Sequence, residues 1–236
     1  MYVGSADKKV YCLNAASGEK VWEFVTEGYI DSSTAVSGGY VYVGNYAGKV
    51  YCLNAATGEK VWEFVTGGSV GSSPTISGGN VYVGSVDKKV YCLSAATGEK
   101  TWEFVTENYV YSSPAFADGY VYVGSIDGKV YCLNAASGEK VWEFLTGDRI
   151  ESSPAITDGF VYIGSADDKV YCLNAATGEK VWEFVTENDV RSSPAVTGGY
   201  VYVGSFDGKV YRLKAAEGDT GSWPMFRYNL ERTGAR

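Results

Sequence analysis

The sequence predicts an all-β protein, a six-bladed β-propeller of four-stranded antiparallel blades. The first observation is a 40-residue repeat, in which the segment KVYCLNAATGEKVWEFVT occurs unchanged at residues 49–66 and 169–186. The second is that each repeat holds four short segments rich in Val, Tyr, Phe and Trp. Turns that contain glycine separate these segments, which is the signal of β-hairpins. The third is that no segment keeps a 3.6-residue period, so we expect almost no helix.

The repeats number six, because tryptophan marks six units at Trp22, Trp62, Trp102, Trp142, Trp182 and, one residue late, Trp223. We label the four strands of a unit A to D. They are predicted at 192–196 (A), 200–204 (B), 169–173 (C) and 180–185 (D). A four-stranded unit of about 40 residues has the size of a propeller blade. Neither alternating set of Val-Tyr-Cys-Leu is polar, which is typical of a sheet covered on both faces.

The two ends of the chain predict that the ring closes. The N-terminus begins at strand B of the first blade, so strand A of that blade is missing there. Residues 223–227 replace strand D of the sixth blade, and residues 232–236 are in register to supply the missing strand A. Closure would remove exposed sheet edges. We therefore expect one domain over residues 1–236 and a monomer; the alternative is that separate chains exchange strands.

Composition excludes several classes of function. The chain has 20 Lys plus Arg against 28 Asp plus Glu, a net charge of −8, which argues against binding to nucleic acid or to an anionic membrane. No apolar run approaches the roughly 20 residues that cross a bilayer, so we expect no membrane insertion. Histidine is absent, which excludes Ser-His-Asp and Cys-His catalysis and histidine metal sites. We expect no enzyme, no cofactor and no metal.

Residues that recur at one register have structural interpretations. The five cysteines share one position of strand C, too far apart between blades for disulfides, and we expect small buried side chains there: Cys12, Cys52, Cys92, Cys132 and Cys172. The aspartates of the B–C turns are expected to shape turns rather than to bind calcium. The tryptophans are expected to pack between blades rather than to bind sugars or bases.

At this point the residues resemble a known family. Gly-Ser-x-Asp-Gly-Lys-Val-Tyr, followed by Leu-Asn-Ala-Ala-Thr-Gly-Glu-Lys-Val-Trp-Glu-Phe, is similar to the pyrroloquinoline-quinone (PQQ)-like propeller repeat, and residues 223–234 resemble a closing segment of such proteins. The resemblance implies an extracytoplasmic location. It also implies a docking contact between blades formed by Ala16, Gly18 and Trp22 and their copies. Two features depart from the family: its well-known members have eight blades, and Asn14 and its copies stand where Asp is common, with Ser94 in the third repeat.

Differences between the repeats predict where a ligand binds. They concentrate in the D–A loops (27–29, 67–69, 107–109, 147–149 and 187–189), in the residue that opens strand A, and in the B–C turns. These connections lie on one face of an antiparallel blade. The candidate ligand face comprises Asp31, Tyr46, Tyr111, Glu151, Arg191, Phe206 and Arg232, a mixed set suited to a protein, a peptide or a small polar ligand. The alternative is that these loops vary because no packing constrains them.

The favoured function is a non-catalytic scaffold or binding module with near-identical repeats, engineered or recently amplified. The first alternative is a fragment or relative of a PQQ-dependent quinoprotein dehydrogenase. The resemblance counts against it, because quinone-binding members carry an adjacent cysteine pair and haem-bearing members carry Cys-x-x-Cys-His, and neither is present here. The second alternative is an extracellular adhesion or surface repeat domain.

Overall fold

The computed structural model describes residues 1–216 and the backbone of residues 226–228. Its strands form six antiparallel sheets, and no helix occurs in these residues. The first sheet has three strands, β1 (Tyr2–Gly4), β2 (Lys9–Leu13) and β3 (Lys20–Val25). The all-β prediction is confirmed.

The other five sheets each have four strands in chain order. The second contains β4 (Ala35–Ser37), β5 (Tyr40–Gly44), β6 (Lys49–Asn54) and β7 (Lys60–Val65). The third contains β8 (Thr75–Ser77), β9 (Asn80–Ser85), β10 (Lys89–Ser94) and β11 (Lys100–Val105). The fourth contains β12 (Ala115–Ala117), β13 (Tyr120–Gly124), β14 (Lys129–Asn134) and β15 (Lys140–Leu145). The fifth contains β16 (Ala155–Thr157), β17 (Phe160–Ser165), β18 (Lys169–Asn174) and β19 (Lys180–Val185). The sixth contains β20 (Ala195–Thr197), β21 (Tyr200–Gly204), β22 (Val210–Lys214) and β23 (Phe226–Tyr228).

The innermost strand differs from its prediction at residues 192–196, because β20 covers only Ala195–Thr197. The hydroxyl of Ser192 takes the place of a backbone partner: its Oγ donates to the Gly204 carbonyl at 2.8 Å and accepts from the Gly204 N–H at 2.8 Å. Pro194 has no N–H to pair. Side-chain bonding therefore replaces the first half of the predicted strand.

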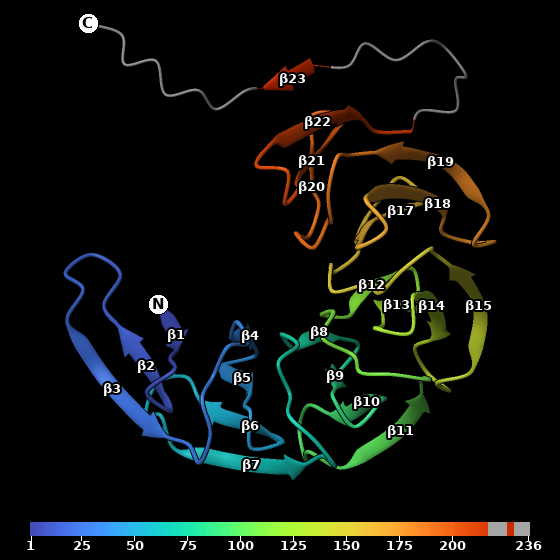
Figure 1. The fold of residues 1–236 in the computed structure, drawn as a ribbon. Coiled ribbons are helices and arrows are strands. Elements are labelled where there is room, and N and C mark those ends of the chain that lie inside the picture. Colours follow the sequence, from blue (N-terminus) through green and yellow to red (C-terminus); the bar gives the residue numbers. More distant parts are fainter. Residues whose placement is uncertain (217–225, 229–236) are drawn as a thin grey trace, which may run out of the picture.

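The sheets succeed one another around an arc, with the short first strands β4, β8, β12, β16 and β20 on its inner side (Figure 1). In the described part of the chain no strand pairing joins the first sheet to the sixth, and the arc is open between them (Figure 1). The first sheet has three strands in the described part of the chain. The residues predicted to supply its strand A, 232–236, lie outside the described residues.

The core lies between consecutive sheets rather than inside any one of them. One cluster joins Val90, Cys92 and Trp102 of the third sheet to Val121 and Leu133 of the fourth, all at most 8 % exposed. Four similar clusters repeat this packing along the arc. The middle strands are buried on both faces, as the apolar pattern predicts, and all five cysteines are buried and free, also as predicted.

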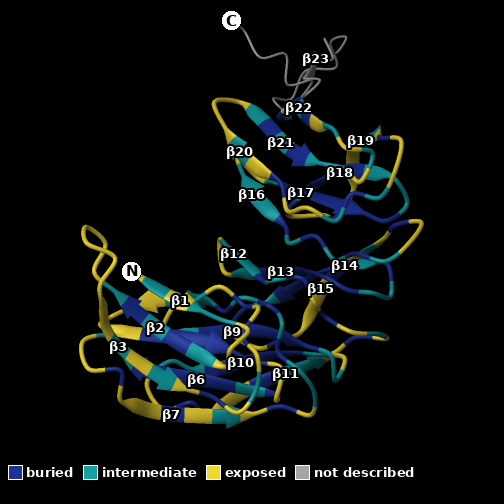
Figure 2. Cartoon of the chain, turned by 60° about the vertical axis from the view of Figure 1, so that its left-hand side comes forward, coloured by how far each residue is buried: buried dark blue, intermediate teal, exposed yellow. Residues whose placement is uncertain are grey.

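The two ends of the arc lack this cover (Figure 2). Val3 is 39 % exposed, whereas its copies Val43 and Val83 are fully buried. A β-carbon on Gly164 would overlap Cγ1 of Val190 in the next loop. On Gly204 of the sixth sheet it would meet nothing closer than Ser192 Oγ at 3.6 Å. The outer faces of the first and sixth sheets therefore have no neighbouring sheet in the described part of the chain.

Candidate functional site

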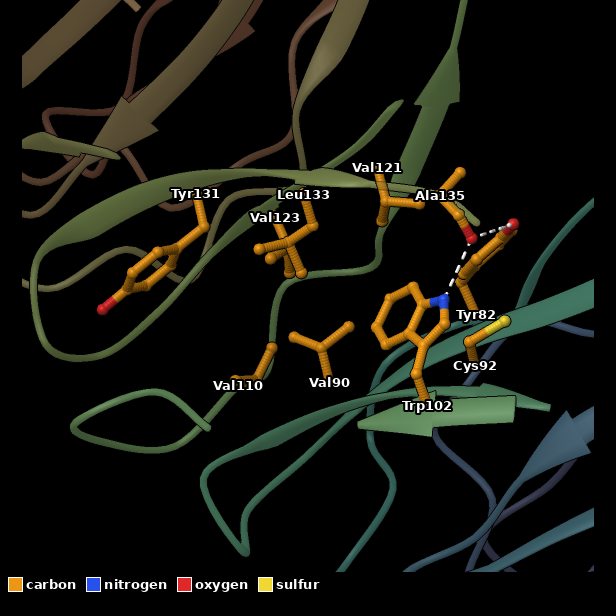
Figure 3. Close-up of a cluster of buried hydrophobic side chains, with 10 residues drawn as sticks. All are labelled: Tyr82, Val90, Cys92, Trp102, Val110, Val121, Val123, Tyr131, Leu133 and Ala135. Carbon is orange, nitrogen blue, oxygen red and sulfur yellow. Dashed lines mark hydrogen bonds between the residues drawn. The ribbon is translucent and has the colours of Figure 1, made fainter. Parts of the chain in front are cut away.

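The contact between consecutive sheets is built from one indole, one phenol and one carbonyl (Figure 3). Trp102 Nε1 donates to the carbonyl of Ala135 at 2.9 Å, and the Tyr82 hydroxyl donates to the same oxygen at 3.4 Å. The indole lies against Gly138, where an added β-carbon would be 2.6 Å from Trp102 Cδ2. The same indole bond joins Trp22, Trp62 and Trp142 to Ala55, Ala95 and Ala175 of the following sheets.

The structure places the predicted docking residues with one shift. The accepting carbonyl belongs to the first alanine of each Ala-Ala pair, such as Ala55, and not to the second, which is the copy of Ala16. The preceding Asn54 shapes this turn, because its Oδ1 accepts from the backbone N–H groups of Ala56 and Thr57. The asparagine that departs from the family pattern thus has a turn-forming role. Trp223 lies outside the described residues.

The first sheet carries a copy of the docking surface that nothing covers in the described part of the chain. Gly18 has φ +74°, close to the +76° of Gly138, but a β-carbon there would have no heavy atom within 4 Å. Gly18 is exposed, whereas Gly138 is buried. The first sheet therefore presents a glycine surface of the shape that receives an indole on the other sheets.

The D–A loops and B–C turns lie on one face because backbone hydrogen bonds join them. The Tyr29 carbonyl accepts from the Tyr46 N–H at 2.9 Å, and the Asp189 carbonyl accepts from the Phe206 N–H at 2.9 Å. Equivalent bonds link Ser69 to Val86, Tyr109 to Ile126 and Arg149 to Ala166. Five loops with different side chains are thus attached in the same way.

The aspartates of the B–C turns anchor these loops. Asp87 Oδ2 accepts from the Tyr91 hydroxyl at 2.6 Å and from the Gly67 N–H at 2.7 Å. Asp127 and Asp167 do the same in their sheets. No group of three or more His, Cys, Asp or Glu side chains suited to a metal ion is found among the residues that the structure describes.

One half of this face is aromatic. Tyr46 and Tyr111 come from different sheets and approach the same point, since a β-carbon on Gly71 would lie 3.9 Å from Tyr46 Oη and 3.7 Å from Tyr111 Cδ1. Both rings are about two-fifths exposed, at 40 % and 39 %. Burial, and then the neighbouring Asp31 carboxylate, raises the pKa of Tyr46. Tyr29 lies 6.2 Å from Tyr46, and Tyr109 lies 6.2 Å from Tyr111, between ring centres.

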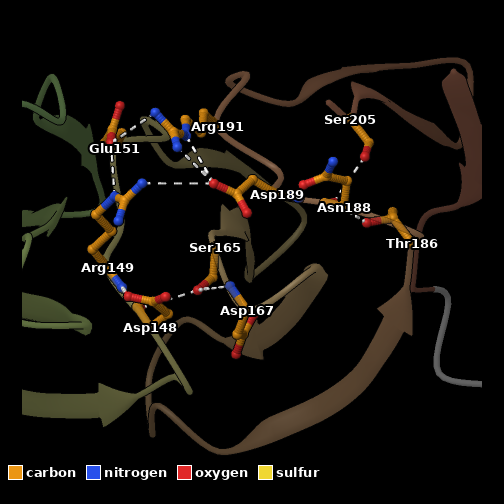
Figure 4. Close-up of polar contacts among 10 residues, drawn as sticks. All are labelled: Asp148, Arg149, Glu151, Ser165, Asp167, Thr186, Asn188, Asp189, Arg191 and Ser205. Carbon is orange, nitrogen blue, oxygen red and sulfur yellow. Dashed lines mark hydrogen bonds and ion pairs between the residues drawn. The ribbon is translucent and has the colours of Figure 1, made fainter. Parts of the chain in front are cut away.

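The other half is charged and internally paired (Figure 4). Arg149 Nε donates to Glu151 Oε1 at 3.0 Å, and Arg191 Nη2 donates to Asp189 Oδ2 at 2.7 Å. Arg191 also lies 3.5 Å from Glu151 Oε1 and 4.8 Å from the centre of the Phe206 ring. Two carboxylates and two guanidinium groups thus neutralise one another here.

The candidate face therefore resolves into two groups. The structure brings Asp31, Tyr46 and Tyr111 together, and separately brings Glu151, Arg191 and Phe206 together; Arg232 lies outside the described residues. Arg149 and Asp189 were not singled out by sequence, although both lie in the loops whose variation marked the face. Tyr29 and Tyr109 were missed in the same way, and an aromatic side chain in a varied loop is the signal that could have identified them.

The cysteines have no environment suited to nucleophilic catalysis. Burial raises the pKa of the Cys52 thiol to about 11 and that of the Cys132 thiol to about 12. The thiolate is the reactive form, and it is scarce at neutral pH when the pKa lies so high. No helix long and apolar enough to cross a bilayer is found in the described ranges.

Comparison with known proteins identifies the family to which the chain belongs. A family model described as "Outer membrane protein assembly factor BamB" matches residues 6–143 and, in a second overlapping match, residues 106–224. The chain belongs to this family of PQQ-like propeller proteins. Among curated proteins, no match to the chain is found.

Two solved structures share the fold. BamB from Moraxella catarrhalis is 22 % identical, with a TM-score of 0.67 over 97 % of this chain and 85 % of that one. The computationally designed Ika8 protein is 18 % identical, with a TM-score of 0.82 over 91 % of this chain and 67 % of that one. At these identities the likeness to both structures establishes the propeller fold alone. A PQQ-like propeller of repeated sheets is thus the scaffold that carries the two groups of the candidate face.

Proposed function

We propose that this PQQ-like propeller is a non-catalytic scaffold that binds a protein or peptide segment on the face formed by its D–A loops and B–C turns. The observation that carries the proposal is the uniform attachment of these loops. Backbone bonds such as Tyr46 N–H to Tyr29 carbonyl hold each loop alike, while the exposed side chains differ from sheet to sheet. A constant frame with varied side chains is the arrangement of loop-based recognition surfaces. The family description, an assembly factor, also favours protein binding.

The scaffold is proposed to be a closed six-bladed ring, one domain and one monomer. Trp223 would cover Gly18 of the first blade, and residues 232–236 would supply the missing strand A. Support comes from the exposed surface at Gly18, whose four buried copies each receive an indole. Native mass spectrometry tests closure: a single species near 25.4 kDa is expected, and a multiple of that mass would mean that chains close on one another.

The location is proposed to be extracytoplasmic. The description of the family model concerns outer membrane protein assembly, which favours a place outside the cytoplasm. The free cysteines are compatible with this proposal because each is buried, and Cys52, Cys92, Cys132 and Cys172 are at most 1 % exposed. Thiols without access to oxidants or to one another form no disulfides.

Selection from a random peptide library tests the binding function. The immobilised chain is expected to enrich peptides, and these peptides should bind the variant Tyr111→Ser more weakly than the unaltered chain. Tyr40→Ser is the matched control, because Tyr40 is similarly exposed, at 38 % against 39 %, but follows the A–B turn at the opposite end of the strands. Enrichment of no peptide, or equal loss with both variants, would contradict a binding face at the loops.

A further inference from the structure

We infer that the loop face binds the cationic side chain of a lysine or arginine in a peptide, at the site formed by Asp31, Tyr46 and Tyr111 around Gly71. The inference rests on the proposed function, since it assumes that a peptide binds this face. It adds the chemical class of the peptide and the point of contact.

The first step is the position of Gly71. Four positions before strand A, the second to sixth sheets carry Asp31, Gly71, Tyr111, Glu151 and Arg191. Gly71 alone among them has no side chain, and the two tyrosines beside it remain partly exposed. A β-carbon at this point would be in ordinary van der Waals contact with both rings, at 3.7 and 3.9 Å. The two rings therefore border the place where the other sheets carry a side chain.

The second step is the charge next to this place. Asp31 precedes strand A of the neighbouring second sheet, and its carboxylate contributes to the raised pKa of Tyr46. In the described part of the chain no ion pair reaches Asp31, whereas Arg149 and Arg191 both bind Glu151. Among the described residues, the Asp31 carboxylate beside Tyr46 therefore has no cationic partner. Cations are attracted both to the faces of such rings and to a carboxylate.

The same chain contains a comparable set of contacts around Arg191, which serves as a template. Arg191 lies four positions before strand A of the sixth sheet and 4.8 Å from the ring of Phe206. It pairs with Glu151, which holds the same position in the fifth sheet. Gly71 holds the same position in the third sheet, and Asp31 holds the position of Glu151 in the second. Gly71 thus has a carboxylate at the template's position and lacks the guanidinium. Val86 stands where the template has Phe206, and the rings beside Gly71 come instead from Tyr46 of the second sheet and Tyr111 before the fourth. A cationic side chain from a ligand would supply the missing guanidinium or ammonium group to this carboxylate and lie against these two rings.

The surroundings favour a peptide over a lone small cation. Tyr29 and Tyr109 extend the aromatic surface on either side, with 54 % and 43 % of each residue exposed. Exposed rings next to a charged anchor suit the apolar and backbone parts of an extended segment. The net charge of −8 would also draw a basic segment toward the protein.

The probe for this site is a fluorescein-labelled peptide of twelve residues, with three lysines spaced by Gly and Ser, measured by fluorescence anisotropy at about 150 mM salt. The same peptide with three N-acetyl-lysines is its neutral counterpart. We expect the lysine peptide to bind at least about tenfold more tightly than the acetylated one. Undetectable binding of the lysine peptide, or equal binding of the two, would overturn the inference.

Three variants locate the contact. Asp31→Asn and Glu107→Gln each remove one negative charge from the same face, and Glu107 is exposed and pairs with Lys129. We expect a loss of about tenfold for the first and of less than about twofold for the second. Gly71→Arg places a guanidinium of the chain itself beside Asp31 and should abolish binding. Equal losses for Asp31→Asn and Glu107→Gln, or unchanged binding by Gly71→Arg, would overturn the inference.

The outcome separates this inference from the proposed function. Library peptides that depend on Tyr111 but contain no basic residue, and that bind Asp31→Asn normally, would leave the binding face in place and remove the cation site. Failure of every peptide to bind the face would instead reject the function on which the site depends.

Discussion

The replacement Gly138→Ala tests whether the contact between consecutive sheets depends on a glycine against an indole. Gly138 has φ +76°, where an L-residue with a β-carbon is strained by about 1–2 kcal/mol. The added carbon would also lie 2.6, 2.8 and 2.9 Å from three atoms of the Trp102 indole, which is 8 % exposed. Overpacking of this kind costs about 1–3 kcal/mol. The expected loss in the free energy of unfolding is therefore about 2–5 kcal/mol.

Gly159→Ala is the matched control. Gly159 has φ +78°, but its β-carbon would meet nothing within 4 Å, so only the backbone strain of about 1–2 kcal/mol applies. Urea titrations followed by tryptophan fluorescence give the free energy of unfolding for both variants. Because repeat arrays can unfold in parts, circular dichroism should follow the same transition. Equal destabilisation by the two variants would refute the idea that the indole contact requires glycine.

Three further predictions concern ring closure, the burial of a cysteine and the pH dependence of stability. In urea titrations, Gly18→Ala should lower the free energy of unfolding as much as Gly138→Ala does if the ring closes onto the first blade. If the surface at Gly18 is open, the loss should only equal that of Gly159→Ala. Cys92, fully buried with its pKa raised by burial to about 11, should react with a thiol reagent at pH 8 only after unfolding; rapid reaction of the native chain would contradict its burial. Hydrogen bonds from Lys100 and Lys89 lower the pKa of Glu103, so their stabilisation is complete above the ordinary pKa of 4.5 and is lost as pH falls through the lower native value. The thermal unfolding midpoint should thus stay constant from pH 8 to about pH 5 and decrease below pH 5. The decrease should be smaller in Glu103→Gln. A midpoint that already decreases at pH 6 would show that other titratable groups dominate.

The strands could be predicted because each apolar pattern occurs several times in the chain. The strand predicted at 180–185 is β19, and the strand predicted at 200–204 is β21. Strand A was predicted to begin at residue 192, too early in the chain, because Pro, Ala and Val in this segment favour an extended backbone. The pairing of the Ser192 hydroxyl with Gly204 is a side-chain bond that no apolar period reveals. Propensity describes the backbone well only where the backbone itself forms the hydrogen bonds.

The division of the candidate face into two groups could not be predicted. Arg191 meets Glu151 across 40 residues of sequence, and Tyr46 and Tyr111 approach Gly71 from two different sheets. Whether side chains on consecutive loops touch depends on the angle between sheets, which follows from packing at contacts such as Trp102 with Gly138. Variation among repeats showed which loops to examine. It did not show which charges would neutralise one another and which would remain free to attract a ligand.

The attachment of the loops through main-chain atoms has a consequence for evolvability. The Tyr46 N–H and the Tyr29 carbonyl form the same bond whatever side chains these positions carry, proline at the donor excepted. Replacement of an exposed side chain other than the anchoring aspartates therefore leaves intact both these main-chain hydrogen bonds and the packing between sheets. Specificity and folding stability are encoded at separate positions, so selection can retarget this face, one sheet at a time, without first acquiring compensating changes in the core.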